Sequence, residues 1–565
     1  MAKEMSKAKT GANAVVYCGL VIAAITFFNV VAHRFFKRVD FTEDHVYTLS
    51  KSSREMVEHL PDRINVKAFI SKDLQPPFSQ VSQYVRDTLS EYANASHGKF
   101  RWEAIDPGED HALEEEATKL KVPKVPRGRA SSSGINLSAT YLGVAFEYQG
   151  NVESIPQING PEGLEFQITS IIKMLAEKKK KIAVASSEGE LVTTGGDPRM
   201  GGSPGGMQWL KQAARQYDIV DVALATGEKP IADDVDALLI VGPKQQFSER
   251  AKFVVDQFLM KGKAVGFLVD GMVIESPRGQ MQMPGMDQPR VGRKNEVGLD
   301  DLLAHYGFKV RDDFLMEPRQ NIQGPIPYQG QTVLVNYPAF IVATDLDKEN
   351  FITSGLKGAV LPFASSLDLI KDAQPGLQVT KLMSTTADAW RQTGFFIFDP
   401  QRQELKVGSD KGPFVLAYAA TGKLKSFFAG KPYPTEKGEK VTPPPADASS
   451  GEARPLDEST GSVRIVVVGD SEFASDMYIG QVGQYVQSYR ANVPLFMNII
   501  DFLAQDQALA PVRSKGMTSR PLTVSSAWVP SAIKYGNIVG VPLLFILYGV
   551  VRWRLRTLRR RNAAL

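Results

Sequence analysis

Cysteine is almost absent from this chain of 565 residues, which has a single one, Cys18, inside an apolar run. One thiol excludes an internal disulfide, and without a CxxC or a Cys/His cluster the usual spacing of zinc ligands is missing as well. The chain also lacks a large excess of either charge, because 66 Lys and Arg nearly balance 62 Asp and Glu and leave a formal net charge of +4. We therefore expect no general nucleic-acid footprint.

Phosphate-binding motifs are also missing. The glycines between Gly195 and Gly206 match neither GxxxxGK[ST] nor GxGxxG, and Asp197 among them would repel a phosphate. We interpret this stretch as a surface loop. The chain is therefore expected to lack its own ATP-hydrolysing machinery, and we predict no cofactor and no metal.

Two long apolar runs lie near the ends of the chain, at residues 14–32 (AVVYCGLVIAAITFFNVVA) and 535–553 (YGNIVGVPLLFILYGVVRW). Each is long enough to cross a hydrocarbon core of about 30 Å as a helix. A cleaved signal peptide is the alternative for the first run, although no small-x-small cleavage site closes it, and a buried core helix is the alternative for the second. In the second run Gly536, Gly540 and Gly549 would permit close helix packing, although just Gly536 and Gly540 have the small-xxx-small spacing.

Positive charge fixes the predicted orientation. The second run is followed by a basic tail, residues 554–565, and six arginines stand at or just after the end of the run: Arg552, Arg554, Arg556, Arg559, Arg560 and Arg561. Arginines next to an apolar run hold that helix end in the cytoplasm. Two spans place both termini on one side, so residues 1–13 and the tail are predicted to be cytoplasmic and residues from about 33 to 533 extracytoplasmic.

The sequence pattern of residues 33–160 predicts a small α/β unit. INVKAFI has the pattern of a buried strand, the following FSQVSQYVRDTLSEYANAS places Val81, Val85 and Leu89 on one helical face, and KFRWEAIDP is a second strand. This order suggests a parallel, thioredoxin-like unit without redox cysteines. Residues 122–134, rich in Pro, Gly and Ser, are predicted to form a loop, and GVAFEYQGNVESIPQI a hairpin.

The part from 161 to 430 alternates strands and helices, which predicts a doubly wound, mostly parallel sheet and an α/β fold class. Its strands include IAVASSEGE, ALLIVGP and AVGFLVDG. Residues 272–295 are predicted to be a long loop and residues 431–462 a mobile linker. The strand RIVVVGDSEF opens the part from 463 to 527, and we expect it to rejoin the same sheet.

Polar residues follow three of these strands, which in an open α/β sheet is where ligands usually bind. They are expected to line one edge and to face a ligand or a divalent cation: Ser187, Glu188, Glu190, Asp270, Asp470 and Ser471. Turn formation and helix capping are the alternative roles. A hydrolase nucleophile at Ser471 is a further alternative, but none of the six histidines has a recognisable triad context, so we predict that the chain is not an enzyme.

A run of four lysines, Lys178–Lys181, follows the amphipathic helix LEFQITSIIKMLAE. We interpret it as a solvated helix end. Contact with anionic headgroups or cell-wall polymers is the alternative.

Five stretches in this order resemble the auxiliary components of ABC-type transport systems linked to gliding motility, the GldG-like proteins. They are VDFTEDHVYTLS, EFQITSIIKMLAEKKKKIAVASSEGE, DVDALLIVGPK with SERAKFVVDQFLMKGKAVGFLVD after it, RIVVVGDSEFASD, and NVPLFMNIIDFLAQDQALAPVRSK. The resemblance covers nearly the whole chain. The family often has a histidine in a GHGE-like turn where this chain has SSEGE, so no role of that histidine transfers.

The resemblance implies an accessory subunit in a bacterial inner membrane, with the extracytoplasmic part in the periplasm. Its implied partners are a multi-span permease, against which the three glycines of the second run would pack, and through it a cytoplasmic ATPase. An extracytoplasmic substrate, a cell-wall component or a motility component is the further partner. A membrane-anchored module that binds a saccharide, lipid or peptide is the alternative function.

Overall fold

The structure is a computed structural model of the chain. It describes residues 19–24, 26–27, 48–108, 110–131, 134–194, 206–224, 231–275, 290–328, 331–394, 396–398, 407–434, 440–441, 455–505, 509–513, 534 and 536–562. The chain divides into two compact units, Met1–Lys515, which we call the body, and Gly516–Leu565, which we call the C-terminal segment.

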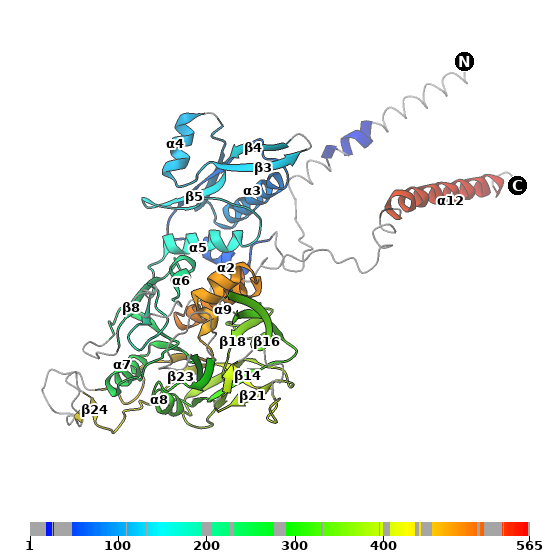
Figure 1. Cartoon of the computed structure of the whole chain (residues 1–565). Coiled ribbons are helices and arrows are strands. Elements are labelled where there is room, and N and C mark those ends of the chain that lie inside the picture. Colours follow the sequence, from blue (N-terminus) through cyan, green and yellow to red (C-terminus); the bar gives the residue numbers. More distant parts are fainter. Residues whose placement is uncertain are drawn as a thin grey trace, which may run out of the picture. The chain divides into compact units, whose positions relative to one another are not determined.

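The N-terminal part of the body contains a four-stranded sheet in the order β2-β1-β5-β6 (Figure 1). Strands β1 (Ile64–Ile70) and β2 (Phe100–Ile105) run parallel and are connected through helix α3 (Phe78–Ala95), while β5 (Leu142–Tyr148) and β6 (Asn151–Ile155) form an antiparallel hairpin. The predicted strand–helix–strand unit and the predicted hairpin are thus confirmed. The narrower interpretation as a thioredoxin-like unit stays a prediction.

Helix α3 packs on this sheet through its apolar face. Val85 and Leu89 are buried in the same core as Val66 of β1, and helices α2 (Lys51–Glu58) and α5 (Leu164–Ala176) contribute to that core. The spacing of four residues puts the two α3 side chains one above the other on the helix, so both reach the sheet.

Residues 122–134 do not form the predicted loop. Strand β3 (Val125–Ser131) pairs antiparallel with β4 (Gly134–Thr140), after helix α4 (His111–Lys119). A two-stranded ladder satisfies its backbone groups without an alternating apolar pattern, so a stretch rich in Pro, Gly and Ser can pair although its side chains do not predict a strand.

The rest of the body is built on a ten-stranded sheet. Its parallel half has the order β8-β7-β9-β10-β26 and consists of β8 (Asp218–Val222), β7 (Lys181–Ala185), β9 (Val235–Val241), β10 (Ala264–Leu268) and β26 (Val463–Val468). Because the chain goes from β7 to β8 on one side and then to β9 on the other, the strand order reverses between β7 and β9. The prediction that the strand after the linker rejoins this sheet is confirmed by β26, which lies between β10 and β23.

The other half of the sheet is antiparallel, so the prediction of a mostly parallel sheet is correct for one half alone. This half contains β13 (Phe308–Val310), β17 (Asp345–Leu346), β19 (Leu367–Leu369), β20 (Leu377–Ser384) and β23 (Val415–Gly422). Several of these strands are only two or three residues long. Strands this short contain too few residues to show an apolar periodicity, so the sequence does not indicate whether they pair parallel or antiparallel.

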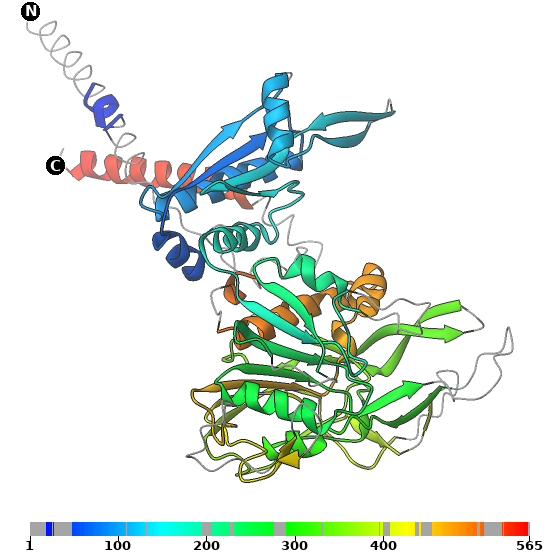
Figure 2. The same cartoon turned by 90° about the vertical axis from the view of Figure 1, so that its left-hand side faces the viewer.

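Helices cover both faces of the ten-stranded sheet (Figure 2), as the doubly wound prediction requires. Helices α6 (Gln208–Ala213) and α9 (Asn492–Leu503) share one apolar core with Val184 of β7, and α7 (Glu249–Met260) and α8 (Asp300–His305) share the other with residues such as Ala183. Successive strand residues point to opposite faces, so neighbours such as Ala183 and Val184 enter different cores.

Smaller sheets and short helices complete the body. The remaining strands are β11 (Met272–Glu275), β12 (Arg290–Lys294), β14 (Asp313–Met316), β15 (Asn321–Tyr328), β16 (Gln331–Ala343), β18 (Ala359–Pro362), β21 (Trp390–Thr393), β22 (Phe396–Phe398), β24 (Tyr433–Pro434) and β25 (Lys440–Val441). The helices are η2 (Glu472–Ala474), η3 (Met477–Gln481), η4 (Val482–Gln484), η5 (Gln487–Ala491) and α10 (Ala510–Arg513). The two ends of the predicted loop 272–295 pair as β11 and β12, whereas residues 276–289 and most of the predicted linker lie outside the described residues.

The C-terminal segment contains η6 (Gly536–Gly540) and α12 (Val541–Asn562). Within the part of the chain that is described, Ile538–Leu555 is the one stretch long and apolar enough to cross a membrane, by length and composition. Residues 19–24 and 26–27 are helical, and the rest of the first predicted span lies outside the described residues. The first span therefore stays a prediction.

Candidate functional site

The six polar residues predicted to share one sheet edge follow β7, β10 and β26, which end on the same side because these strands are parallel. We call this side the carboxyl edge. It includes the point between β7 and β9 where the strand order reverses, which in open α/β sheets is the usual place for a ligand. The turn after β7 also contacts the turn after β9, because the Lys244 backbone N–H donates to the Glu188 carbonyl over 2.8 Å.

Two glutamates of this edge form a buried carboxyl pair. Glu188 is 2% and Glu190 7% exposed, and the Glu188 backbone N–H donates to Glu190 Oε2 over 2.6 Å. Burial, and after it the neighbouring Glu188 carboxyl, raise the pKa of Glu190 to about 8. The raised pKa favours a protonated Glu190 carboxyl at neutral pH.

Ser471 and Asp270 connect the ends of β26 and β10. The Ser471 backbone N–H donates to Asp270 Oδ1 over 2.7 Å and its hydroxyl donates to Asp270 Oδ2 over 2.6 Å. Burial, with a smaller contribution from Glu472, raises the pKa of Asp270 to about 6. Gly242, with φ +62°, makes room for this contact, because a Cβ there would lie 2.6 Å from Ser471 Oγ.

These contacts give Ser471 a structural role. Its side chain is fully buried and its proton is donated to Asp270, so the hydroxyl is not presented to a substrate. A serine nucleophile must be accessible to the substrate, and an adjacent general base must take the proton from its hydroxyl. The geometry thus favours the turn-forming alternative over the hydrolase alternative.

Asp470 lies beside this pair with no exposed surface. Its Oδ1 accepts the Glu472 backbone N–H over 2.8 Å, while Oδ2 has no hydrogen-bond partner among the described residues. Burial raises the pKa of Asp470 well above its usual value, and Asp270 and Glu472 raise it further. The raised pKa favours the neutral carboxyl over a buried negative charge, which would cost free energy.

The exposed part of the carboxyl edge carries an ion pair. Lys244 Nζ lies 3.8 Å from Glu472 Oε1, and both side chains are about one-third exposed, at 32% and 31%. Across the described ranges, no three His, Cys, Asp or Glu side chains are arranged to hold a metal ion.

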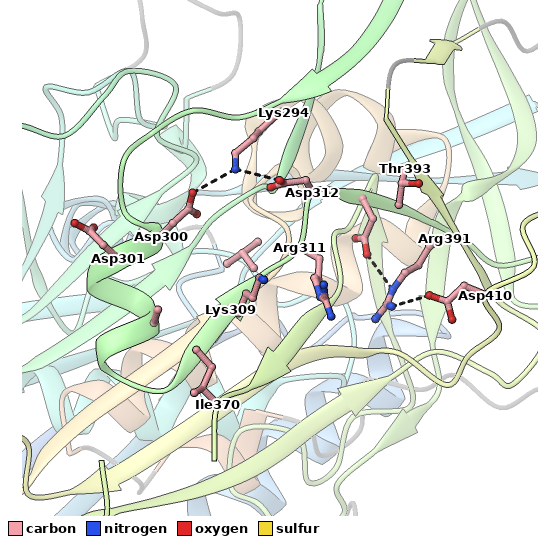
Figure 3. Close-up of a pocket in the computed structure, with 13 residues that line it drawn as sticks. Lys294, Asp300, Asp301, Lys309, Arg311, Asp312, Ile370, Arg391, Thr393 and Asp410 are labelled. Carbon is pink, nitrogen blue, oxygen red and sulfur yellow. Dashed lines mark hydrogen bonds and ion pairs between the residues drawn. The ribbon is translucent and has the colours of Figure 1, made fainter. Parts of the chain in front are cut away.

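Sequence reasoning missed a polar cavity of about 740 Å³, drawn in Figure 3. Arg391 lies on one side of it and contacts Asp313 over 3.1 Å and Asp410 over 2.8 Å, with its guanidinium 4.3 Å from the Phe414 ring centre. On the other side Lys294 lies between two aspartates, 3.5 Å from Asp300 and 3.0 Å from Asp312.

Asp313 anchors this cavity to the carboxyl edge. It is 1% exposed and accepts hydrogen bonds from the Ser366 backbone (2.8 Å) and hydroxyl (2.6 Å), while burial raises its pKa. Ser365 donates its hydroxyl to the Asp313 carbonyl over 2.7 Å and its backbone N–H to the Gly469 carbonyl, also over 2.7 Å. The ten-stranded sheet therefore positions both the cavity and the carboxyl edge. No local motif indicates the cavity, because its residues come from segments far apart in the sequence.

A second unpredicted feature is Arg513, which ends α10 near the end of the body. It is 2% exposed and donates to Asn498 Oδ1 over 2.5 Å and to Asp501 Oδ2 over 2.8 Å, both on α9. Its guanidinium lies 5.0 Å from the ring centre of Phe166 on α5, and its Nε has no hydrogen-bond partner among the described residues. We call this the Arg513 junction. It ties α5 and α9 to α10.

The three glycines predicted to pack on a permease lie in η6 and α12. At Gly536, Gly540 and Gly549, an added Cβ would meet no described atom within 4 Å. Their packing role stays a prediction.

Comparison with known proteins covers most of the chain. A family model described as "ABC-type uncharacterized transport system" matches residues 179–505, and a domain of unknown function matches residues 43–147. A protein of Borreliella burgdorferi, named "Uncharacterized protein", is 22% identical over 567 residues, which are 96% of this chain and 97% of that protein. The solved mmIFT52 N-terminal domain has 12% identity and a TM-score of 0.31, over 57% of this chain and 96% of that one. A TM-score this low supports no conclusion about fold.

The first family model spans more than half of the chain, including both halves of the ten-stranded sheet. It also spans all six residues predicted at the carboxyl edge. The chain therefore belongs to the family described as an ABC-type uncharacterized transport system, which confirms its recognition as an auxiliary component of such systems.

Proposed function

We propose that the chain is a non-catalytic accessory subunit of a bacterial inner-membrane ABC transporter complex. It pairs with a multi-span permease and, through it, with a cytoplasmic ATPase, and it couples ATP-driven motion to an extracytoplasmic substrate, cell-wall component or motility component. The family match over residues 179–505 carries this proposal. The apolar stretch Ile538–Leu555 supplies a segment that can contact the permease within the membrane.

Coupling needs a rigid path within the body, from its last described helix, α10, to the ten-stranded sheet. The Arg513 junction supports such a path, because a buried and hydrogen-bonded ion pair resists separation. Tyr217 reinforces it by donating its hydroxyl to Asp501 Oδ1 over 2.7 Å, which ties the start of β8 to α9. A displacement of α10 would therefore be passed to the ten-stranded sheet.

Affinity purification of the tagged full chain in a mild detergent tests this function. We expect a multi-span permease and an ATPase to co-purify in fixed ratio, and recovery of the chain alone would contradict the proposal. Combined Gly536→Leu and Gly540→Leu substitutions should lower the recovery of the permease, because they fill the small-xxx-small surface. Ile538→Phe is the matched control, since it adds bulk at an exposed residue of η6 that is none of the three glycines.

The predicted topology has a separate test. Both termini are placed in the cytoplasm and the body in the periplasm. A cysteine replacing exposed Lys348 in a Cys18→Ser chain should react with a membrane-impermeant maleimide in cells with a permeable outer membrane. Labelling only after the inner membrane is opened would contradict this orientation.

A binding module is the second candidate function, and the 740 Å³ cavity favours it. Its paired cations and carboxylates offer donors and acceptors to a polar ligand such as a saccharide or a peptide. Lys294→Gln, at a side chain 43% exposed, should abolish ligand binding while the complex still assembles. Unchanged retention of glycan and peptide probes by this variant would remove the candidate.

A further inference from the structure

A basic pocket of about 310 Å³ lies at the edge of the ten-stranded sheet opposite the carboxyl edge, where β10 and β26 begin. Four cationic side chains line it, and Asp236 is the one carboxylate among its lining residues. The Asp236 carboxylate already accepts the Lys181 backbone N–H over 2.9 Å. The four cations are Lys180, Lys261, Lys263 and Arg464.

Arg464 is the unusual member of this group. It is the second residue of β26, and its guanidinium lies 5.8 Å from the ring centre of Phe502 on α9. Its Nη1 is buried and has no hydrogen-bond partner among the described residues. Burial lowers the pKa of Arg464, and no carboxylate contributes an opposing shift. A buried N–H of a charged group is normally paired, so this nitrogen marks a place for an acceptor.

The three lysines of the pocket already make hydrogen bonds or ion pairs within the protein. Lys180 Nζ donates to the carbonyls of Ala504 and, over 3.4 Å, Gln505, at the C-terminal end of α9. Lys261 pairs with Asp233 over 2.6 Å, and Lys263 donates to the Asp233 carbonyl over 2.9 Å. An ammonium group has three protons, so each lysine can also donate into the pocket.

We propose that this basic pocket binds a phosphate group, carried either by free inorganic phosphate or by an anionic lipid headgroup. Arg464 would contribute the planar N–H donors that match phosphate oxygens, and the lysines would contribute charge and further donors. The pocket volume accommodates a phosphate with a small substituent. This proposal does not rest on the proposed transport function, and it assigns a specific site to the contact with anionic groups that the lysine run suggests.

Thermal unfolding of the purified full chain in a neutral detergent tests the site. The probes are inorganic phosphate, compared with chloride at equal ionic strength, and a short-chain phosphatidylglycerol, compared with the matched phosphatidylcholine. We expect a saturable rise in Tm with at least one of the two phosphate probes and none with chloride. A rise with inorganic phosphate assigns free phosphate, and a rise with phosphatidylglycerol alone assigns a lipid headgroup.

Variants decide whether the effect belongs to this pocket. Arg464→Gln should weaken binding about tenfold or more, the expected loss of a charge-assisted hydrogen bond to the anion. Lys261→Gln combined with Lys263→Gln should weaken it about threefold without touching the core, and this second variant decides the matter if Arg464→Gln does not fold. Arg101→Gln, at an exposed position of β2, is the matched control and should bind normally. No stabilisation by either probe, or equal stabilisation with both pocket variants and the control, would overturn the proposal.

Discussion

The body contains two guanidinium groups next to α9 that differ in what surrounds them. Both Nη atoms of Arg513 donate hydrogen bonds inside the protein, one of them to the carboxylate of Asp501. Arg464 has a buried Nη1 with no partner among the described residues. Burying a charge costs free energy unless it is paired, so the first arginine serves the structure and the second is available to a ligand.

The largest effect should come from breaking the paired arginine. Arg513→Met is expected to lower the free energy of unfolding by about 3–5 kcal/mol, because Asp501 would keep a buried charge without its cation. Arg464→Met should change it by about 0.5 kcal/mol or less, since no internal pair is lost. Urea unfolding of the full chain in detergent, followed by tryptophan fluorescence, measures both.

A charge-removing control sharpens this result. Adding Asp501→Asn to Arg513→Met removes the buried negative charge and should recover part of the lost stability. Equal losses for the two arginine variants would remove the distinction between them.

A smaller loss is expected at the carboxyl edge. Asp270→Ala should cost about 2 kcal/mol, because it leaves the Ser471 backbone N–H and hydroxyl without their acceptor. Ser471→Ala should cost about 1 kcal/mol and leave co-purification with partners unaltered. A double-mutant cycle of the two changes checks the coupling, and full additivity would contradict the contact.

The carboxyl edge should also make stability depend on pH. The pKa of Glu190 is raised to about 8 from an ordinary value of 4.5, so the folded chain holds a proton that the unfolded chain has released between these values. Stability should therefore fall as pH rises from 4.5 to 8, with at most about 1.4 kcal/mol per pH unit from this group. Unfolding at a series of pH values in Glu190→Gln should show a shallower slope, and an unchanged slope would contradict the raised pKa of Glu190.

At the carboxyl edge, the smallest effect is expected at the exposed pair. Lys244→Gln should change the free energy of unfolding by less than about 1 kcal/mol, because its partner Glu472 lies 3.8 Å away and water reaches both side chains. Raising the salt concentration should reduce even this difference. A loss as large as that of Asp270→Ala would show that the pair is not a surface contact.

Local patterns in the sequence predict much of this fold. The strand β1 coincides with INVKAFI, and the three strand-end turns meet at one edge because parallel strands end together. The antiparallel half of the sheet escapes prediction, since strands such as Leu367–Leu369 are too short to show a period. The loop predicted at residues 122–134 is also wrong, because backbone hydrogen bonds form a hairpin there although the side chains show no strand pattern.

The candidate sites divide in the same way. Glu188, Glu190 and Asp470 follow strands, so their placement can be predicted. The raised pKa values of Glu190 and Asp470 depend on burial, which a sequence does not state. The cavity around Arg391 and the Arg513 junction were missed, because each joins residues separated by many positions, such as Phe166 and Arg513. A site whose residues come from distant segments of the chain has no local sequence motif.

The coupling of ATP-driven motion into the body is tested most directly by hydrogen exchange at α9 and α10 in the purified complex. With a non-hydrolysable ATP analogue bound to the ATPase, we predict changed protection of residues 498–513 in the wild-type chain, and loss of that change in Arg513→Lys, which cannot reproduce both hydrogen bonds of the guanidinium. Identical exchange at these residues with and without nucleotide would contradict the account.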